Sequence, residues 1–217
     1  GAAPPGGPAM NASEHVSEQV LDVPRVRPTP APPSWTLPAL AGRLVELSAE
    51  PSGAPLTFAF RLVLDAQRRG EPTAWIAPRA RAFFPPDVAT AGIDLAALPV
   101  IWGAHALEAA RAADLLLRSG GFGLIVVDLG AGIELPLHAI TRLSGLALRH
   151  GAAVVLLTEK KEDRPSLGSL VSLRVHVPRI VREGDRYRCT LHVLKDKRGR
   201  RSGSEVSEVC RGPDGLR

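Results

Sequence analysis

Apolar strand-like segments alternate with amphipathic helix-like segments from Leu37 onward, and this alternation most constrains the fold. Leu124–Asp128 reads Leu-Ile-Val-Val-Asp, a continuous apolar run that is typical of a strand buried on both faces. Ala104–Ser119 places apolar residues on one helical face and is followed by Gly120-Gly121, which predicts the end of a helix. Strands and helices that alternate at these lengths predict a parallel sheet with helices on both sides.

The other segments of the pattern extend this prediction along the chain. We expect further strands at residues 44–49, 73–77, 99–102 and 152–158, and further helices at residues 55–69, 86–91 and 135–150. The pattern then changes, because Leu170–Arg182 and Tyr187–Lys195 alternate as strands around Glu183-Gly184-Asp185, which indicates an antiparallel hairpin. Val206–Cys210 is a candidate for a last strand. The predicted class is therefore α/β, with a mostly parallel central sheet flanked by helices and a C-terminal antiparallel β-hairpin extension.

Composition divides the chain into three parts. Residues 1–36 form a Pro- and Ala-rich arm that we expect to be flexible, although a short amphipathic helix at residues 12–21 is an alternative. Residues 37–198 form the α/β domain. Residues 199–217 are basic and weakly apolar, and we expect a flexible tail that orders on meeting a partner.

Charge and cysteine content limit the kinds of partner, metal site and membrane contact that we expect for this chain. Residues 149–217 hold 16 Lys and Arg against nine Asp and Glu, whereas residues 1–148 hold 11 against 13. A basic C-terminal part suits nucleic acid, an acidic protein surface or simple solvation. The two cysteines, Cys189 and Cys210, have no metal-ligand spacing, and no apolar run reaches the roughly 18–20 residues of a membrane span. We therefore expect a cytoplasmic protein with no metal and no membrane contact.

The turn between the first strand and its helix lacks the residues that bind phosphate. The nucleotide pattern G-x-x-x-x-G-K-[ST] at such a turn needs lysine for the phosphates and a hydroxyl for Mg²⁺. With Gly53 on the second glycine, Ser48 takes the first glycine position, Ala54 the lysine position and Pro55 the hydroxyl position. Pro55 also removes a backbone N–H where a helix N-terminus would donate to phosphate. We therefore expect no nucleotide cofactor and no ATPase activity.

Six collinear segments resemble successive landmarks of the bacterial recombinase RecA core, over about Leu37 to Arg198. They are Gly42–Leu47, Ala66–Gly70, Leu116–Gly120 with Leu124–Asp128 after it, Leu170–Arg174, and Leu194–Lys197. The resemblance implies a RecA-like core.

Several departures from the RecA pattern lie at functional positions. By the resemblance, Arg79 stands where the family has its catalytic glutamate, and Thr158-Glu159 stands where the family has a glutamine that senses the γ-phosphate. Asp128 remains at the position that would help to hold Mg²⁺, and without the hydroxyl opposite it we expect a capping or hydrogen-bonding role. The stretches after Asp128 and after Glu159 are too short for the two DNA-binding loops of a recombinase. These departures imply a degenerate nucleotide site.

A cluster of cations near the C-terminal end is the candidate partner-binding or DNA-binding element. Lys195 and Lys197 match the strand-end lysines of RecA, and Arg198, Arg200 and Arg201 extend them to five cations in seven residues. Such a cluster suits contact with an acidic partner, or weak and sequence-independent DNA binding that falls with salt. A solvated strand end is the alternative.

A RecA-like core with these losses, a Pro-rich arm and a basic end resembles the ImuA family. That resemblance implies a non-catalytic accessory protein of SOS-induced mutagenic translesion DNA synthesis, with ImuB as partner and RecA as a second candidate partner. The alternative is a SulA-like cell-division inhibitor that binds a tubulin-like division protein, because that family also has a RecA-like core without a phosphate loop. A true NTPase with an unusual loop is the third hypothesis.

Overall fold

The computed structural model describes residues 1–2, 35–51, 53–79, 85–178, 180–184, 186–199 and 203–211. The chain divides into a unit of Gly1–Pro30 and a unit of Ala31–Arg217, and the helices and strands belong to the second unit. Most of the expected arm of residues 1–36 therefore lies outside the described residues. No helix among the described residues is long and apolar enough to cross a membrane.

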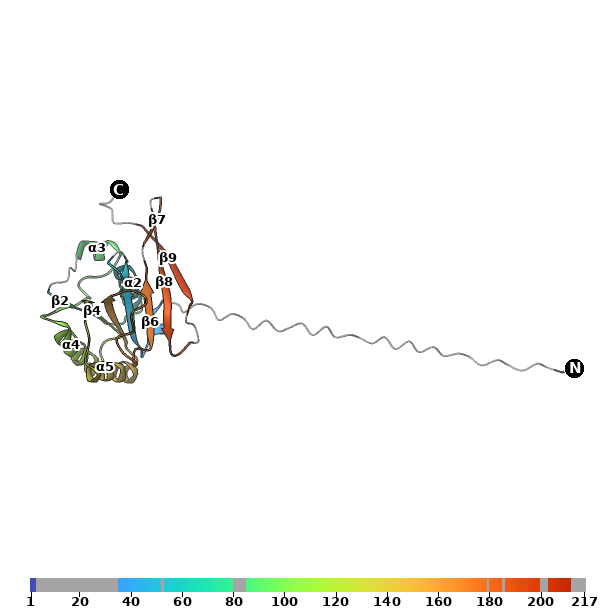
Figure 1. The fold of residues 1–217 in the computed structure, drawn as a ribbon, viewed down its shortest axis with the longest axis horizontal. Helices are drawn as coiled ribbons and strands as arrows, with labels where there is room; N and C mark the ends of the chain where they lie inside the picture. The colour runs from blue at the N-terminus through green and yellow to red at the C-terminus, as the bar shows by residue number, and fades with distance from the viewer. Residues whose placement is uncertain are drawn as a thin grey trace. The chain divides into compact units, whose positions relative to one another are not determined.

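A nine-stranded sheet carries helices on both faces, in the α/β arrangement predicted from the alternating pattern (Figure 1). Its elements, in chain order, are α1 (Leu37–Leu40), β1 (Leu44–Ala49), α2 (Pro55–Arg68), β2 (Thr73–Pro78), α3 (Pro85–Thr90), β3 (Val100–Gly103), α4 (Ala106–Ser119), β4 (Leu124–Ala131), α5 (Leu137–His150), β5 (Ala153–Glu159), β6 (Leu173–Val177), β7 (Val181–Glu183), β8 (Arg186–Asp196) and β9 (Glu205–Arg211).

The strand order is β3-β2-β4-β5-β1-β6-β8-β7, with β9 also paired to β8. The first six strands of this order run parallel, and β8 is antiparallel to β6, β7 and β9. The antiparallel extension predicted for the C-terminal part is thus confirmed. Gly184 forms the turn between β7 and β8 with a φ of +66°, a conformation that glycine adopts without steric cost.

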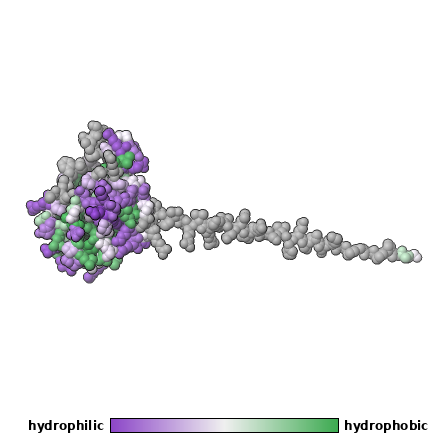
Figure 2. Space-filling model, viewed as in Figure 1, coloured by the Kyte–Doolittle hydropathy of each residue, from purple (hydrophilic) through white to green (hydrophobic). Residues whose placement is uncertain are grey.

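Two hydrophobic layers cover the sheet. Side chains of α1, α2 and α3 pack on one face, and side chains of α4 and α5 pack on the other. The strands between the layers are buried along nearly their whole length, which explains why β4 and β5 read as unbroken apolar runs. Figure 2 shows hydrophobic side chains at the surface in the region of α4 and α5, where Leu115 and Leu137 are exposed.

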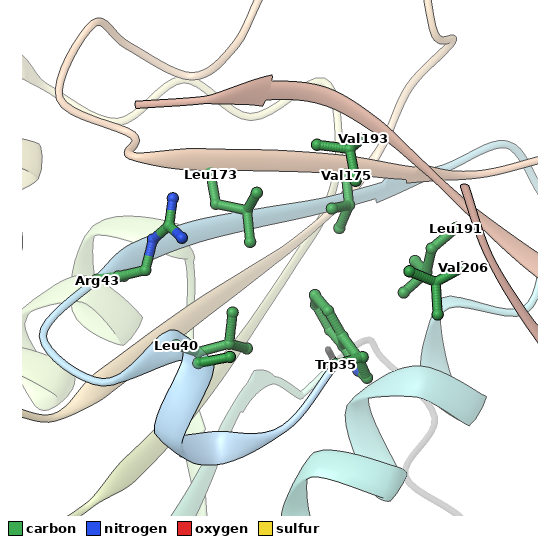
Figure 3. A pocket seen from close by; sticks show the side chains of 9 residues that line it. Trp35, Leu40, Arg43, Leu173, Val175, Leu191, Val193 and Val206 are labelled. Atoms are coloured by element: carbon green, nitrogen blue, oxygen red, sulfur yellow. The ribbon is translucent and has the colours of Figure 1, made fainter. Parts of the chain in front are cut away.

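Trp35 and α1 cover the face of the antiparallel strands. The Trp35 indole N–H donates to the Phe58 carbonyl oxygen at 2.8 Å, and the two rings meet edge to face at 6.3 Å. Trp35 and Leu40 lie opposite Leu173 and Val175 around an apolar cavity of about 20 Å³, with Leu191 and Val206 beside Trp35 (Figure 3). That is about the room for one water molecule, so the cavity is far too small for a nucleotide.

The last strand corrects one sequence-based expectation. Residues 199–217 were expected to form a flexible tail, but β9 pairs with β8 from Glu205 to Arg211. Val206 packs against the hydrophobic layer that contains Leu191, which gives the strand an apolar anchor. Within this range, the structure therefore favours the candidate strand at Val206–Cys210 over the tail.

Candidate functional site

The residues of the expected nucleotide site come together at the carboxyl edge of the parallel strands. Ser48 in β1 stands beside Thr158 in β5, and Asp128 in β4 stands beside Leu157. Glu159 ends β5 next to Ala49, and Arg79 follows β2. This edge is where ligands bind in open α/β sheets. The geometry of each residue therefore decides what the edge can hold.

The turn between β1 and α2 is shorter than the expected loop. β1 continues through Ala49 and α2 begins at Pro55, so Ser48 is a strand residue and the turn comprises only residues 50–54. A Cβ atom on Gly53 would lie 2.7 Å from the Val177 carbonyl oxygen and 2.9 Å from the Ala49 Cβ. The Gly53 N–H donates to the Glu50 carbonyl oxygen at 2.8 Å. Gly53 thus allows the turn to pack closely against the ends of β1 and β6, and its donor is already used.

The N-terminus of α2 offers few donors to an anion. Its N-cap, Ala54, makes no side-chain hydrogen bond to the helix, and Pro55 has no N–H. The Thr57 N–H donates to the Ala54 carbonyl oxygen at 3.2 Å. A helix N-terminus binds phosphate through free backbone N–H groups. Two of the first three helical residues therefore contribute no free N–H at this position.

The Ser48 side chain is fully buried and hydrogen-bonded to β6. Its hydroxyl lies 3.2 Å from the Val175 carbonyl oxygen and 3.1 Å from His176 Nδ1. Burial lowers the pKa of His176, the Glu162 and Glu50 carboxylates oppose that shift, and Arg174 and His192 add to it. A serine and a histidine in contact resemble a nucleophile and its base. With both side chains enclosed, this pair holds β1 to β6 and does not reach a substrate.

The remaining candidates differ in exposure. Asp128 is 4% exposed and precedes a β-bulge in the pairing of β4 with β5. Glu159 is half-buried, whereas Arg79 is exposed and donates its backbone N–H to the Gly103 carbonyl oxygen at 3.1 Å. In the described part of the chain, no three His, Cys, Asp or Glu side chains lie close enough together to hold a metal ion.

Glu46 is a buried charged residue that sequence reasoning missed. It is 0% exposed, in the middle of β1, and its carboxylate forms an ion pair with Lys160. It also accepts hydrogen bonds from the Thr158 hydroxyl (3.1 Å), the Ser166 hydroxyl (2.9 Å) and the Leu167 N–H (2.9 Å). The available signal was a glutamate inside the otherwise apolar run of β1, because a buried carboxylate needs partners.

Two cations contact the segment that follows β5: the buried Arg174 in β6 and the half-buried Lys195 in β8. The Arg174 guanidinium, 5% exposed, donates to the carbonyl oxygens of Lys161 (3.3 Å) and Glu162 (3.2 Å) and also to that of Arg164. Lys195 Nζ lies 3.4 Å and 3.3 Å from the carbonyl oxygens of Gly168 and Ser169. Burial lowers the pKa of Lys195, and the positive charge of Lys197 lowers it further. Residues 160–169, which we name the pinned segment, are therefore fixed by their own chain.

The candidate cations lie at the opposite edge from the expected nucleotide site. The end of β8 pairs with the beginning of β6, so Lys195, Lys197 and Arg198 lie at the amino edge of the parallel strands. The Arg198 guanidinium donates to the carbonyl oxygens of Ala41 (2.8 Å) and Gly42 (2.6 Å), and Lys197 is exposed. Arg200 and Arg201 lie outside the described residues. The structure therefore does not bring the two groups of candidates together.

No protein-family model matches the chain. Over 140 residues, the chain is 25% identical to Protein RecA of Bifidobacterium breve and of Bifidobacterium longum, and 26% identical to Protein RecA of Rubrobacter xylanophilus. The core is RecA-like. The match covers 56% of this chain but only 36%, 35% and 40% of the three relatives, respectively, so the chain spans well under half of their length.

The carboxyl edge of this RecA-like core differs in character from a phosphate cradle. Ser48 and Gly53 are packed against β6, and the pinned segment follows directly after β5. The charged groups that sequence reasoning missed, Glu46 and Arg174, contact protein atoms of the pinned segment. These contacts fix the surface that the carboxyl edge presents to solvent.

Proposed function

We propose that the chain is a non-catalytic RecA-like accessory protein of the DNA-damage response. In this proposal it acts in the bacterial cytoplasm, in SOS-induced mutagenic translesion synthesis, through protein contacts with a polymerase-like ImuB partner and with RecA. The similarity to RecA over 140 residues supports a role linked to DNA damage. The finer assignment rests on the resemblance to the ImuA family described above.

The packing of residues 50–54 carries the non-catalytic part of the proposal. A phosphate cradle needs free backbone donors and a lysine, whereas this turn packs Gly53 against Val177 and begins α2 with proline. Asp128 alone is not enough for phosphoryl transfer, which depends on several groups around the phosphates. Without nucleotide-driven changes, the remaining use of the core is recognition through its surface.

Equilibrium binding of labelled ATP with Mg²⁺ to the full chain tests this part. We expect no saturable binding at concentrations where a RecA protein with an intact phosphate loop, measured in parallel, saturates. Micromolar affinity that is lost in Asp128→Asn would overturn the proposal, because it would show a working metal and nucleotide site.

Damage-induced mutation frequency in the source organism tests the cellular role. We expect deletion of the gene to lower mutation frequency after ultraviolet irradiation, and both the wild-type gene and the Asp128→Asn variant to restore it. Unchanged mutagenesis in the deletion strain would refute the translesion role. Division filaments on overexpression that depend on the tubulin-like division protein would support the SulA-like alternative instead.

A further inference from the structure

Cations from three elements gather at the amino edge of the sheet, away from the carboxyl edge described above. Arg118 lies in the last turn of α4 and Arg149 in the last turn of α5. Lys195, Lys197 and Arg198 lie at the end of β8 and in the turn after it. We name these five residues the amino-edge cations.

Contacts between their elements show that they share one surface. Arg198 donates to the Gly42 carbonyl oxygen, and a Cβ atom on Gly42 would lie 3.6 Å from the Leu148 Cα in the last turn of α5. The His150 ring at the end of α5 would lie 3.2 Å from a Cβ atom on Gly120, the C-cap of α4. The chain ends of α4, α5 and β8 therefore meet around the start of β1.

The nearby carboxylates neutralise this surface only in part, although the exposed Glu71 lies beside Gly123 at the same edge. Asp196 is buried in an ion pair with Arg43, and Asp114 is shared between Arg118 and Arg142. The charge of Lys197 contributes to the lowered pKa of Lys195, after burial, as expected where positive charges are crowded. On the β7–β8 hairpin at the carboxyl edge, by contrast, Glu183 pairs with Arg188 at 2.7 Å.

Helix stability explains only part of the arrangement. Arg118 and Arg149 are favourable at helix C-termini because they lie near the negative end of the helix dipole. Lys197 and Arg198 follow a strand, so this argument does not apply to them. Lys197 and Arg198 lie beside the helix ends and widen the positive surface, although neither of them compensates a helix dipole.

We propose that the amino edge binds the phosphate backbone of nucleic acid without reading its sequence. Arginine forks and exposed lysines suit phosphate oxygens, and several cations spread over one surface suit a repeating polyanion. An acidic protein partner would need an apolar centre for a stable interface. Among the described residues of this edge, the large exposed apolar side chains are Leu148 and Leu115, which lies one turn before Arg118, and His150 is an exposed ring, whereas no Phe, Tyr or Trp is exposed there to stack on bases. The surface therefore favours phosphate contacts.

Fluorescence anisotropy with labelled single-stranded and duplex oligonucleotides of random sequence, at increasing salt, tests the inference on the full chain. The test variant is Arg118→Gln/Arg149→Gln/Lys197→Gln. The matched control, Arg79→Gln/Arg182→Gln/Arg186→Gln, removes the same net charge from exposed residues at the carboxyl edge. Circular dichroism and the midpoint of thermal unfolding check that both variants fold.

We expect the test variant to lose at least tenfold in affinity at low salt and the control to stay within about twofold. The slope of log affinity against log salt should fall by about two to three for the test variant, as expected from about 0.7–0.9 per lost phosphate contact. If the triple variant folds poorly, Lys197→Gln alone should still lower affinity, since Lys197 is exposed in a turn.

Equal losses in the two triple variants would overturn the inference, because they would indicate a response to net charge alone. Absence of binding by the wild-type chain at low salt would overturn it as well. Tighter binding to an acidic polypeptide such as polyglutamate than to DNA would assign the surface to a protein partner. None of these readouts depends on the translesion role, so the two proposals fail independently.

Discussion

Gly53 is the residue at which the turn between β1 and α2 comes closest to the sheet. Its missing side chain leaves room for the Val177 carbonyl oxygen and the Ala49 side chain. In a phosphate-binding loop, glycine allows close approach of the backbone to a ligand. Here the same property lets the chain approach itself, so the residue that looked like a remnant of nucleotide binding now has a packing role.

We predict that Gly53→Ala destabilises the protein. The new methyl group would lie 2.7 Å from a backbone oxygen, which cannot move as easily as a side chain. Overpacking of this kind costs about 1–3 kcal/mol, and urea denaturation would measure it. Gly145→Ala in α5 is the control, since nothing lies within 4 Å of the added methyl group and alanine favours helix by about 1 kcal/mol. Equal stability of Gly53→Ala and wild type would contradict the packing role.

His176 predicts a stability change with pH. Because burial lowers its pKa in the folded state below the ordinary value of 6.5, the unfolded chain binds a proton first as the pH falls. Its contribution to stability is complete above about pH 6.5 and is lost as the pH falls toward the lower folded pKa. The free energy of unfolding should decrease by up to about 1.4 kcal/mol per pH unit from this group. Denaturation from pH 7.5 to 5 should show a shallower slope in His176→Asn, and an unchanged slope would argue against a neutral buried imidazole.

At the scale of elements, the pinned segment differs from an open loop because side chains of neighbouring strands fix its backbone. Glu46 accepts hydrogen bonds from Ser166 and Leu167. Arg174 donates to the carbonyl oxygens of Lys161, Glu162 and Arg164. These side chains come from β1 and β6, which are adjacent strands. The sheet itself therefore fixes a segment that has no regular secondary structure.

We predict that Arg174→Met loosens the pinned segment. Methionine fills similar volume but cannot donate to the carbonyl oxygens of Lys161, Glu162 and Arg164. Hydrogen exchange should become faster for the backbone amides of residues 160–164, 166 and 167, and trypsin should cleave faster after Lys161, whereas the Arg164–Pro165 bond resists trypsin. Arg182→Met, at an exposed position in β7, is the control and should leave both rates unchanged. Unchanged exchange in Arg174→Met would show that the segment is held by other contacts.

Most strands were predictable because each has a local signal, but the single strand expected at Leu170–Arg182 is two strands, β6 and β7, in the structure. The apolar run of Leu124–Asp128 predicted β4, and the alternation around Gly184 predicted the β7–β8 hairpin. The contacts of Glu46 were not predictable, since its partners Thr158 and Ser166 lie 112 and 120 residues away in the sequence. Such partners are set by the order of strands, which a local pattern does not contain. The same reason hid the role of Lys195, whose contacts with Gly168 and Ser169 depend on the pairing of β8 with β6.

At the scale of the whole RecA-like unit, the two edges of the sheet differ in what they present. The carboxyl edge carries the packed turn and the beginning of the pinned segment, whereas the amino edge carries the amino-edge cations, of which Lys195 also contacts the end of the pinned segment. The sequence alone identified residues of both edges as candidates for functional sites. Only the strand order shows that they lie at opposite ends of the parallel strands.

The C-terminal strands make the fold dependent on residues beyond β6. Arg43 is 5% exposed and paired with Asp196, and β9 adds Val206 to the hydrophobic layer. Hydrogen bonds from Arg43 and from the N–H groups of Gly199 and Arg198 lower the pKa of Asp196, although its burial alone would raise it. Asp196 is therefore held as a carboxylate in a closed ion pair.

We predict that a chain ending after Leu194 loses its stable fold. The truncation leaves Arg43 buried without its carboxylate, and loss of one partner of a buried ion pair costs about 3–5 kcal/mol. Thermal unfolding and solubility would measure the effect. A chain ending after Arg211 keeps these contacts and is the control. A cooperative transition at the same temperature in both chains would contradict the prediction.

The pinned segment has a consequence for how the proposed accessory protein is controlled. Its conformation is set by Glu46, Arg174 and Lys195, which belong to the same chain and need no small molecule. Under the proposed non-catalytic role, the surface it presents is therefore the same whether cellular ATP is high or low. Under the proposed function, control then acts on the number of copies in the cell, through synthesis and degradation, and a burst of synthesis after damage would by itself act as the switch.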